Sequence, residues 1–530
     1  MSSVSRTCAN WPAGLMATLL AVGLMNASAF AADYSANASD PRVDTEATLK
    51  VGSNQPAATL DPHLASQGGG DFTYTTPIFD RLLRLNGRFE LQPMLAKSWR
   101  FARDGTYLEL DLRDDVKFHD GTRFDAAAVK ANVERAKTGP RSTAAAALTT
   151  VQGVDIVNDF KVRLRLTPGQ GATLPFALAV HAGAMISPKA LADPTRDLAL
   201  NPGDAGSGPY IATQIKTNEV VFYERAPTPT WDKGAGLAKK LEIHTIRGAA
   251  ALRAIQSGAV DTAHLTSVEI PTALNFVKSR GGDFTALPDQ NGTYYGVYFR
   301  STRPSLSNPR VRQAIAMAID RPALQRSVFN SACTTATQFF PAHHWAHVPD
   351  WVDHRFDPAK AKAEIKAAGA EGTKIEILGP GQEFDSAAIA IQAMLKDVGL
   401  DVTVSTMLMT DAIVAFRGRN RDALSFAVGG DAHPGNVFSA IFVGGLGMMP
   451  EAELPALKGL LAKADNPTLN AKEQMVVYRQ VYELAAKQAV VFPLCFAQQL
   501  FVSKKNVLFT DSINERPGIA RDFRFLAKAK

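Results

Sequence analysis

The sequence predicts an α/β protein, because strand-like and helix-like segments follow one another along its 530 residues. Residues 294–299 alternate like a strand, and Val311, Ala314 and Ile315 then begin an apolar stripe of helical period. Further on, residues 387–399 form a second amphipathic helix, which precedes another strand-like segment. This rhythm predicts helices packed on a mixed sheet. A chain of this length can bury a large core and should divide into two or three lobes.

The N-terminus has the composition of a cleaved signal peptide. Arg6 is the only charge before an uninterrupted apolar run at 14–24, and small residues allow cleavage after Ala29 or Ala31. An uncleaved anchor helix is the alternative, but the apolar run is short for a membrane span. We therefore expect residues 1–31 to be removed.

The cysteines constrain the location of the mature chain. Cys8 precedes the apolar run, so it cannot carry a lipid at the cleavage site, and we expect a periplasmic protein without a lipid anchor. Cys333 and Cys495 remain after cleavage. They could pair in an oxidising compartment, but two cysteines so far apart form no recognisable disulfide framework.

The charge pattern excludes one class of partner. The formal net charge is +6 at pH 7, and the lysines and arginines are scattered along the chain. A nucleic-acid-binding surface would require basic residues in clusters. We therefore expect no nucleic-acid partner.

The first strand-like segment, at 48–52, leads into a glycine-rich region. A turn at Asp61 follows it, and a glycine-rich bend at 66–70 then allows the backbone to approach another group closely. No Gly-Lys-Ser/Thr follows this bend, so it is not a phosphate-binding loop.

The histidines do not stand in a recognisable catalytic context. His119 precedes an Asp-Gly turn dipeptide and lacks a partner at a suitable spacing. His181 lies within an apolar segment, where a packed core histidine is the alternative to a ligand contact. His343, His344 and His347 could meet a metal ion, although a short loop of aromatic residues and histidines is more often a docking loop. We expect no bound metal or other cofactor.

Several ordered motifs are more specific than these patterns. IFDRLLRL and PMLAKSW occur within 78–99, GSGPY at 206–210, SLSNPRVRQAIAMAIDR at 305–321 and FDPAKAKAEIKAAG at 356–369. Together they resemble family 5 extracellular solute-binding proteins of ABC importers, of the dipeptide- and oligopeptide-binding type. The resemblance extends over about residues 48–505.

This resemblance implies a bilobed α/β fold of the periplasmic-binding-protein type (class II), with a hinge, a cleft and an additional small subdomain. The implied division places residues 32–78, 188–294 and 497–530 in lobe I, 79–187 in the subdomain and 295–496 in lobe II.

The resemblance also implies a ligand site. By position Asp431 would pair with the ligand's α-ammonium group, and Ala427 and Gly429 would offer backbone groups. The alternative for Asp431 is a turn aspartate that caps the following loop. Val428 replaces a tryptophan of the relatives and His433 replaces their second aspartate, so the side-chain pockets cannot be transferred.

Further candidates come from the glycine-rich bend and from nearby cations. Arg300 stands where the relatives carry an asparagine, and it and Arg417 are the candidates to meet a ligand carboxylate. The remaining candidates by position are Ser66, Gln67, Gly68 and His181.

The expected function is that of the substrate-binding component of an ABC importer. A monomer would close over a peptide or related amine-bearing solute and deliver it to an inner-membrane permease, without enzymatic activity. One alternative is a carrier of a nickel- or haem-type chelate that uses the histidine loop. A secreted hydrolase is another, but GSGPY is not G-x-S-x-G and no nucleophile stands beside a base. A ligand-sensing regulator of the same fold is disfavoured by the signal peptide.

Overall fold

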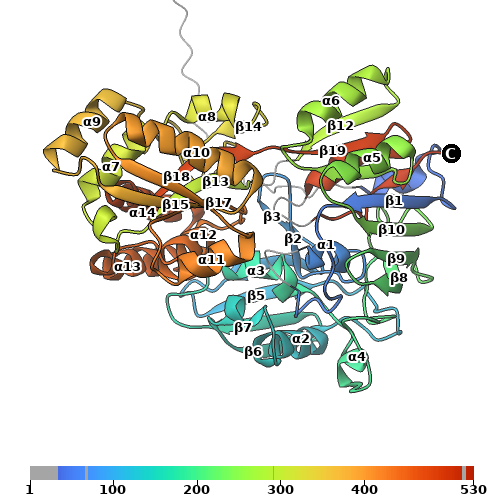
Figure 1. The fold of residues 1–530 in the computed structure, drawn as a ribbon. Coiled ribbons are helices and arrows are strands. Elements are labelled where there is room, and N and C mark those ends of the chain that lie inside the picture. Colours follow the sequence, from blue (N-terminus) through green and yellow to red (C-terminus); the bar gives the residue numbers. More distant parts are fainter. Residues whose placement is uncertain (1–33, 66–69, 290–291, 516–520) are drawn as a thin grey trace, which may run out of the picture. The chain divides into compact units, whose positions relative to one another are not determined.

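The computed structural model describes residues 34–65, 70–289, 292–515 and 521–530. Within them the chain forms sheets of seven, six and four strands, with helices packed around them (Figure 1). The signal peptide predicted at 1–31 lies outside the described residues. In the described part of the chain, no helix has the length and apolar character that a membrane crossing requires.

The seven-stranded sheet, on which lobe I is built, has the order β12-β19-β11-β1-β10-β9-β8. Its strands are β1 (Thr48–Ser53), β8 (Tyr210–Lys216), β9 (Val220–Arg225), β10 (Lys240–Thr245), β11 (Thr262–Leu265), β12 (Phe284–Asp289) and β19 (Gln499–Lys504). β1 pairs in parallel with β10 and β11, and the other pairs are antiparallel. α5 (Ala249–Ser257) follows β10, and α6 (Ile270–Ser279) follows β11.

The six-stranded sheet, on which lobe II is built, has the order β14-β18-β13-β17-β15-β16. Its strands are β13 (Tyr294–Phe299), β14 (Cys333–Thr335), β15 (Lys374–Gly379), β16 (Asp401–Thr406), β17 (Ala423–Val428) and β18 (Val491–Ala497). The helices are α7 (Pro309–Ala318), α8 (Arg321–Ser327), α9 (Pro358–Ala367), α10 (Gln382–Asp397), α11 (Met409–Arg417), α12 (Pro434–Phe438), α13 (Leu454–Ala464) and α14 (Ala471–Gln488). β15 pairs in parallel with β16 and β17.

Helix α7 packs as its apolar stripe predicts. The Asn308 side chain accepts a hydrogen bond from the backbone N–H of Arg310 at 2.9 Å, which caps the helix. Val311 and Ile315 are buried in the core of lobe II. Arg312 is also buried, and it donates to the backbone oxygens of Gln488 and Leu306, so its role is structural.

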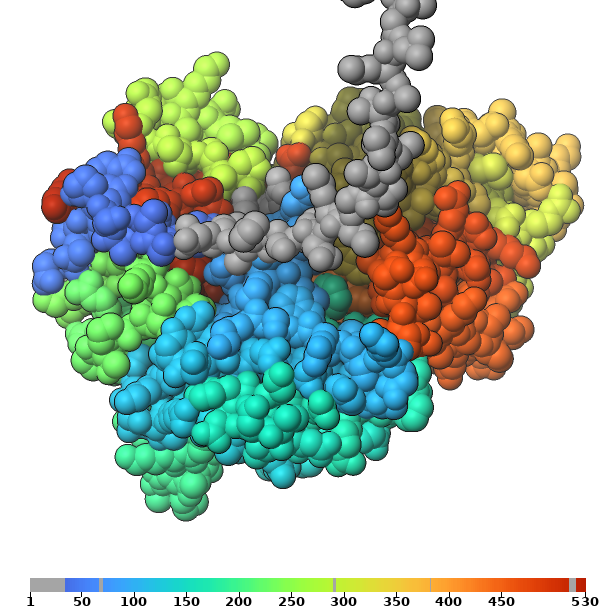
Figure 2. Space-filling model, turned by 180° about the vertical axis from the view of Figure 1, so that it is seen from behind, coloured from blue at the N-terminus to red at the C-terminus, as the bar shows by residue number. Residues whose placement is uncertain are grey.

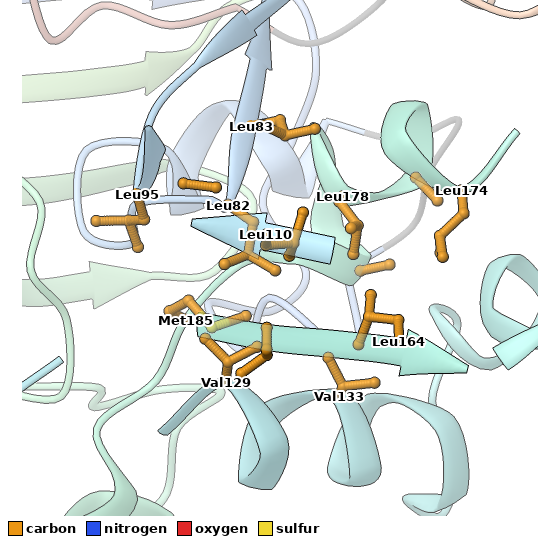
Figure 3. Packing of buried hydrophobic residues seen from close by; sticks show 14 of the residues in the cluster. Leu82, Leu83, Leu95, Leu110, Val129, Val133, Leu164, Leu174, Leu178 and Met185 are labelled. Atoms are coloured by element: carbon orange, nitrogen blue, oxygen red, sulfur yellow. The ribbon is translucent and has the colours of Figure 1, made fainter. Parts of the chain in front are cut away.

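The four-stranded antiparallel sheet is the core of the subdomain. Its strands are β4 (Ala96–Phe101), β5 (Tyr107–Leu112), β6 (Val151–Asn158) and β7 (Lys161–Leu166). Asp125 caps α2 (Ala126–Thr138) by accepting a hydrogen bond from Ala128 N at 3.0 Å. Val129 and Val133 of α2 point toward Leu164 of β7, and Leu178 of α3 (Leu174–Leu178) belongs to the same cluster (Figure 3).

The subdomain packs directly against lobe II. The carboxylate of Asp465, which follows α13, accepts hydrogen bonds from the backbone N–H groups of Gly171 (2.9 Å) and Thr173 (3.1 Å). Phe176 stacks on Trp345 with ring centroids 6.2 Å apart. Figure 2 shows this neighbourhood from behind, with the blue-to-teal subdomain beside the orange part of lobe II.

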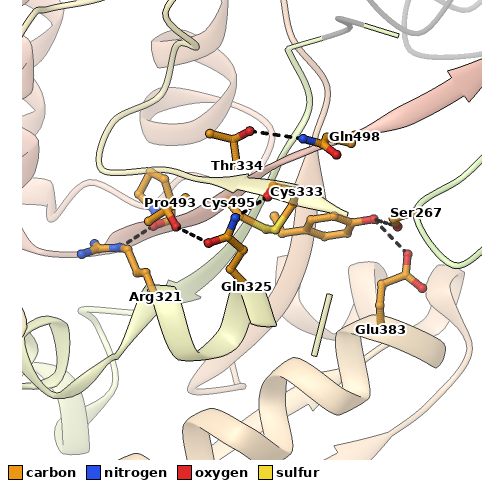
Figure 4. Close-up of a disulfide and its surroundings, with 11 residues drawn as sticks. Ser267, Arg321, Gln325, Cys333, Thr334, Glu383, Pro493, Cys495 and Gln498 are labelled. Atoms are coloured by element: carbon orange, nitrogen blue, oxygen red, sulfur yellow. Dashed lines mark hydrogen bonds between the residues drawn. A yellow bond between two sulfur atoms is a disulfide. The ribbon is translucent and has the colours of Figure 1, made fainter. Parts of the chain in front are cut away.

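The chain connects the two lobes twice, and a disulfide lies at one of these connections. The chain passes from β12 of lobe I to β13 of lobe II, and it returns from β18 to β19. Cys333 of β14 and Cys495 of β18 form a disulfide with their Cα atoms 5.7 Å apart (Figure 4). The sequence alone did not decide whether these two cysteines form a disulfide. The disulfide fixes the edge strand β14 to the strand that leaves lobe II.

A buried ion cluster joins the C-terminal segment of lobe I to the first residues of the subdomain. The guanidinium of Arg524 lies between Asp80 (2.5 Å) and Asp522 (3.1 Å), and Asp522 also pairs with Arg81 at 3.2 Å. Trp231 Nε1 donates to Asp80 at 2.8 Å. The side chains of both ion-paired arginines and both aspartates are at most 6% exposed, so water hardly screens these charges.

Candidate functional site

The carboxyl ends of the parallel strands mark one functional edge in each lobe. In open α/β sheets, ligands bind outside these ends. In lobe I the residues just beyond β1, β10 and β11 include Asn54, Arg247 and Ser267. In lobe II the residues beyond β15 and β17 include Glu383 and Asp431.

Strand β17 extends beyond its parallel neighbour and leaves an open edge. It pairs with β13 along its whole length, but with β15 only at Ala423 and Leu424, because β15 ends at Gly379. Among the described residues, Ser425 to Val428 therefore have no strand on that side. An open strand edge can pair with another extended backbone.

The alternation of hydrogen bonds decides which backbone groups face this open edge. Arg300 N donates to Asp422 O at 2.8 Å, whereas Phe299 N donates to Val490 O, on the opposite side. In an antiparallel pair every second residue bonds to the same neighbour. Residues of β17 that lie opposite even-numbered residues of β13 thus bond to β13. Ala427, opposite Tyr295, directs its N–H and C=O away from β13, toward the open edge.

Asp431 lies in the loop after β17 and makes the hydrogen bonds of a turn aspartate. Its Oδ1 accepts hydrogen bonds from His433 N (2.9 Å) and from Asn436 Nδ2 (3.1 Å), as a turn aspartate does. Burial raises the pKa of its carboxyl group and outweighs these hydrogen bonds, which lower it. Asp431 also lines a cavity.

The cavity has a volume of about 580 Å³ and lies between the subdomain and lobe II. Leu85, Phe176 and Val180 contribute to its wall from the subdomain, and Asp431 and Tyr478 contribute from lobe II. A volume of this size suits a small solute. The aspartate chosen from the sequence therefore lies on a space that can hold a ligand.

The histidine loop, which carries His343, His344 and His347, donates hydrogen bonds to the backbone around Asp431. Within the loop, His344 Nδ1 accepts from Ala346 N at 2.9 Å, so its Nε2 carries the proton and donates to Asp431 O at 3.0 Å. Burial lowers the pKa of His344 to about 3. His347 Nδ1 lies 3.0 Å from Phe340 O, and Trp345 Nε1 donates to Ala432 O at 2.8 Å. Among the described residues, no group of three or more His, Cys, Asp or Glu is placed to hold a metal ion.

The structure does not bring Arg300 to this site. Its side chain is buried in lobe II, where it donates to Phe416 O (2.8 Å) and Leu446 O (3.0 Å) and lies over the Phe416 ring. Burial lowers the pKa of Arg300 to about 10. The proposed contact with a ligand carboxylate is therefore wrong for Arg300, because its guanidinium is occupied by carbonyl groups inside the lobe.

The other sequence candidates are placed as follows. Arg417 is exposed at the end of α11, and it does not line the cavity. His181 is buried in the subdomain, next to cavity-lining Val180 but not itself part of the wall. Ser66, Gln67 and Gly68 lie outside the described residues.

Sequence reasoning missed a hydrogen-bonded group at the junction of the lobes. The hydroxyl of Tyr295 donates to Glu383 Oε1 at 3.2 Å and lies 2.9 Å from Ser267 Oγ of lobe I (Figure 4). Among the described residues, Glu383 Oε2 is buried without a hydrogen-bond partner. The only sequence signal was that Ser267 and Glu383 follow the ends of strands. Glu383 also lies in the first turn of α10, where acidic residues are common because they interact favourably with the helix dipole.

Arg247 was also missed. It follows β10, is exposed, and its Nε donates to Asn54 O at 3.2 Å. It is thus a cation at the carboxyl edge of the lobe I sheet, whereas Arg300 and Arg417 are not. Its position depends on the parallel pairing of β1 with β10, which the sequence alone did not give.

Comparison with known families agrees with this architecture. A family model described as bacterial extracellular solute-binding proteins, family 5 Middle, matches residues 90–449. Glutathione-binding protein GsiB of Escherichia coli K12 is 29% identical over 403 residues, which are 74% of this chain and 73% of that protein.

Solved structures confirm the bilobed α/β fold. NikA from Brucella suis, in complex with Fe(III)-EDTA, is similar with a TM-score of 0.77 and 20% identity, over 91% of this chain and 100% of that chain. A dipeptide-binding protein from Pseudoalteromonas sp. SM9913, in complex with Met-Leu, gives a TM-score of 0.75 and 20% identity over the same shares. At this identity the likeness shows the fold and does not select a ligand.

Proposed function

The chain belongs to the family 5 bacterial extracellular solute-binding proteins, the substrate-binding components of ABC importers, and we propose that its ligand is a peptide or a related amine-bearing solute. The observation that carries this proposal is the open edge of β17, where Ala427 directs its N–H and C=O outward a few residues before Asp431. An extended peptide can add to such an edge as a further strand. Asp431 would then meet its α-ammonium group.

An ion pair with Asp431 cannot supply micromolar affinity alone, so the strand edge must also contribute binding free energy. A charge-assisted hydrogen bond contributes about 1.5–3 kcal/mol, whereas micromolar affinity corresponds to about 8 kcal/mol. The remainder would come from backbone hydrogen bonds at Ala427 and Gly429 and from enclosure of the ligand in the cavity.

Transport would follow from hinge closure. The two connections between the lobes, β12 to β13 and β18 to β19, would act as the hinge. A ligand favours closure only through its higher affinity for the closed form. We place residues 32–78, 188–294 and 497–530 in lobe I, 79–187 in the subdomain and 295–496 in lobe II. The closed monomer would dock on an inner-membrane permease from the periplasm.

Two other functions have less support. A metal-chelate carrier would use the histidine loop, but both ring nitrogens of His344 already have backbone partners, Nδ1 with Ala346 N and Nε2 with Asp431 O. For a hydrolase, His119 is the base considered from the sequence, but its Nε2 bonds to Gly208 O and its Nδ1 is buried with no hydroxyl or thiol bonded to it among the described residues. We therefore propose that the protein binds and transports without catalysis.

Replacing Asp431 with asparagine should weaken dipeptide binding about 10- to 100-fold in isothermal titration calorimetry. Asparagine keeps an oxygen that can accept from His433 N, so the turn should persist while the charge is lost. N-acetylation of the dipeptide should weaken binding to the unmodified protein by a similar factor and have little further effect on the variant. Asp411→Asn, at an exposed position of α11, is the matched control. Unchanged affinity of Asp431→Asn for an amine-bearing dipeptide would overturn the assignment.

A further inference from the structure

The cavity at Asp431 has an unusual charge composition. Two aspartates, Asp431 and Asp465, line it, and none of its lining residues is a lysine, an arginine or a histidine. The remaining wall is made of neutral polar groups and of short or apolar side chains such as Ala146, Ala177 and Leu461. An occupant therefore meets negative charge at two places and positive charge at none of the lining residues.

The second aspartate belongs to a different part of the wall from the first. Asp431 follows β17, whereas Asp465 follows α13 and accepts hydrogen bonds from Gly171 N and Thr173 N of the subdomain. Each carboxylate oxygen has two acceptor sites, so these two backbone bonds leave capacity for a ligand donor. Tyr478 also lines the cavity, and the charge of Asp465 adds to burial in raising its pKa.

The energetics favour a cationic occupant. Burial raises the pKa of both Asp431 and Asp465, which means that their ionised forms lack full compensation in the protein. A carboxylate that is partly removed from water is stabilised by a cation that donates hydrogen bonds to it. An occupant with additional carboxylates would instead add repulsion. The alanine and leucine side chains of the wall can cover the methylene stem of a lysine-like group.

We propose that this cavity selects solutes with two separated cationic groups, such as a peptide with a free α-ammonium group and a lysine or arginine side chain. The inference rests on the proposed function: Asp431 receives the first cation, and Asp465 receives the second. It also predicts discrimination against glutathione, a tripeptide with two carboxylates and one ammonium group, although a protein named for glutathione binding is 29% identical to this chain.

The test compares lysine with norleucine, which has the same methylene stem without the ammonium group. Affinities of Lys-Ala, norleucyl-Ala, Ala-Lys, Ala-norleucine and glutathione are measured by calorimetry for the unmodified protein and for Asp465→Asn. We expect at least one lysyl peptide to bind at least tenfold more tightly than its norleucine counterpart. Glutathione should bind more weakly than both of these peptides. In Asp465→Asn this preference for lysine should fall to twofold or less, while the norleucyl peptides keep their affinity.

The possible outcomes separate this inference from the proposed function. If the norleucyl peptides bind as well as the lysyl peptides, or if Asp465→Asn keeps the full preference, the second cation site is wrong and peptide binding stands. If none of the peptides binds, both are wrong. Because Asp465 also holds Gly171 and Thr173, a general loss of affinity for all peptides in Asp465→Asn would show a structural role alone and would overturn the cation site.

Discussion

Replacing Arg524 with methionine should lower the free energy of unfolding by about 3–5 kcal/mol. Arg524 is buried between Asp80 and Asp522, and it also donates to the backbone oxygen of Thr76. Burial alone would raise the pKa of Asp522, but the charges of Arg524 and Arg81 lower it to about 2. Without Arg524, one of the two buried carboxylates loses its ion pair, and this is the source of the cost.

Urea unfolding followed by circular dichroism measures this loss. The matched control is Lys239→Met, which removes an exposed ion pair with Glu46 and should change the free energy of unfolding by less than about 1 kcal/mol. Equal effects of the two substitutions would contradict the importance of burial. The cluster joins residues 522–524 to residues 80–81, so its loss should also release the C-terminal segment to proteolysis.

Lowering the pH from 6.5 to 5 should destabilise the protein steeply. Burial lowers the pKa of His63 to about 4, with a contribution from the charge of Arg135, and burial lowers the pKa of His344 and His433 to about 3. The ordinary histidine pKa in an unfolded chain is about 6.5. Between these values the unfolded chain binds protons that the folded chain does not, so stability is lost as the pH falls below 6.5.

The expected slope follows from the number of protons. At pH 5 about three protons are taken up on unfolding by these histidines, which corresponds to about 4 kcal/mol per pH unit. The raised pKa values of Asp431 and Asp465 act in the opposite direction, because the folded state then retains protons.

Urea unfolding at a series of pH values tests this prediction. His344→Gln should reduce the slope near pH 5 by about 1.4 kcal/mol per pH unit, since one of the three protons is then absent. Substitution of the exposed Leu408 by alanine should leave the slope unchanged. A free energy of unfolding that stays constant between pH 6.5 and 5 would contradict the burial of His63, His344 and His433 in their neutral forms.

The sequence predicted those features that depend on residues close together in the chain. The apolar stripe that begins at Val311 is buried as its helical period predicts, and the helix starts with a cap at Asn308, a residue type preferred there. The motifs also identified the family. These features depend on the character of a few neighbouring residues, which a single sequence contains.

The site depended on contacts that no local pattern reports. The open edge at Ala427 arises because β15 ends at Gly379, which in this register is three residues before the end of β17, and this requires the pairing of distant strands. Arg300 was a candidate because it is a cation that replaces an asparagine of the relatives, but its long side chain turns inward to backbone carbonyls. Asp465 was missed because nothing in its own segment indicates that it lines the same cavity as Asp431.

A crystal structure of the protein with dialanine bound tests the central claim most directly. We predict that the peptide backbone bonds to the N–H and C=O of Ala427 on the open edge of β17, with its ammonium group about 3 Å from the Asp431 carboxylate. A peptide found away from this edge, or a ligand held only through a metal ion at His343–His347, would contradict the account.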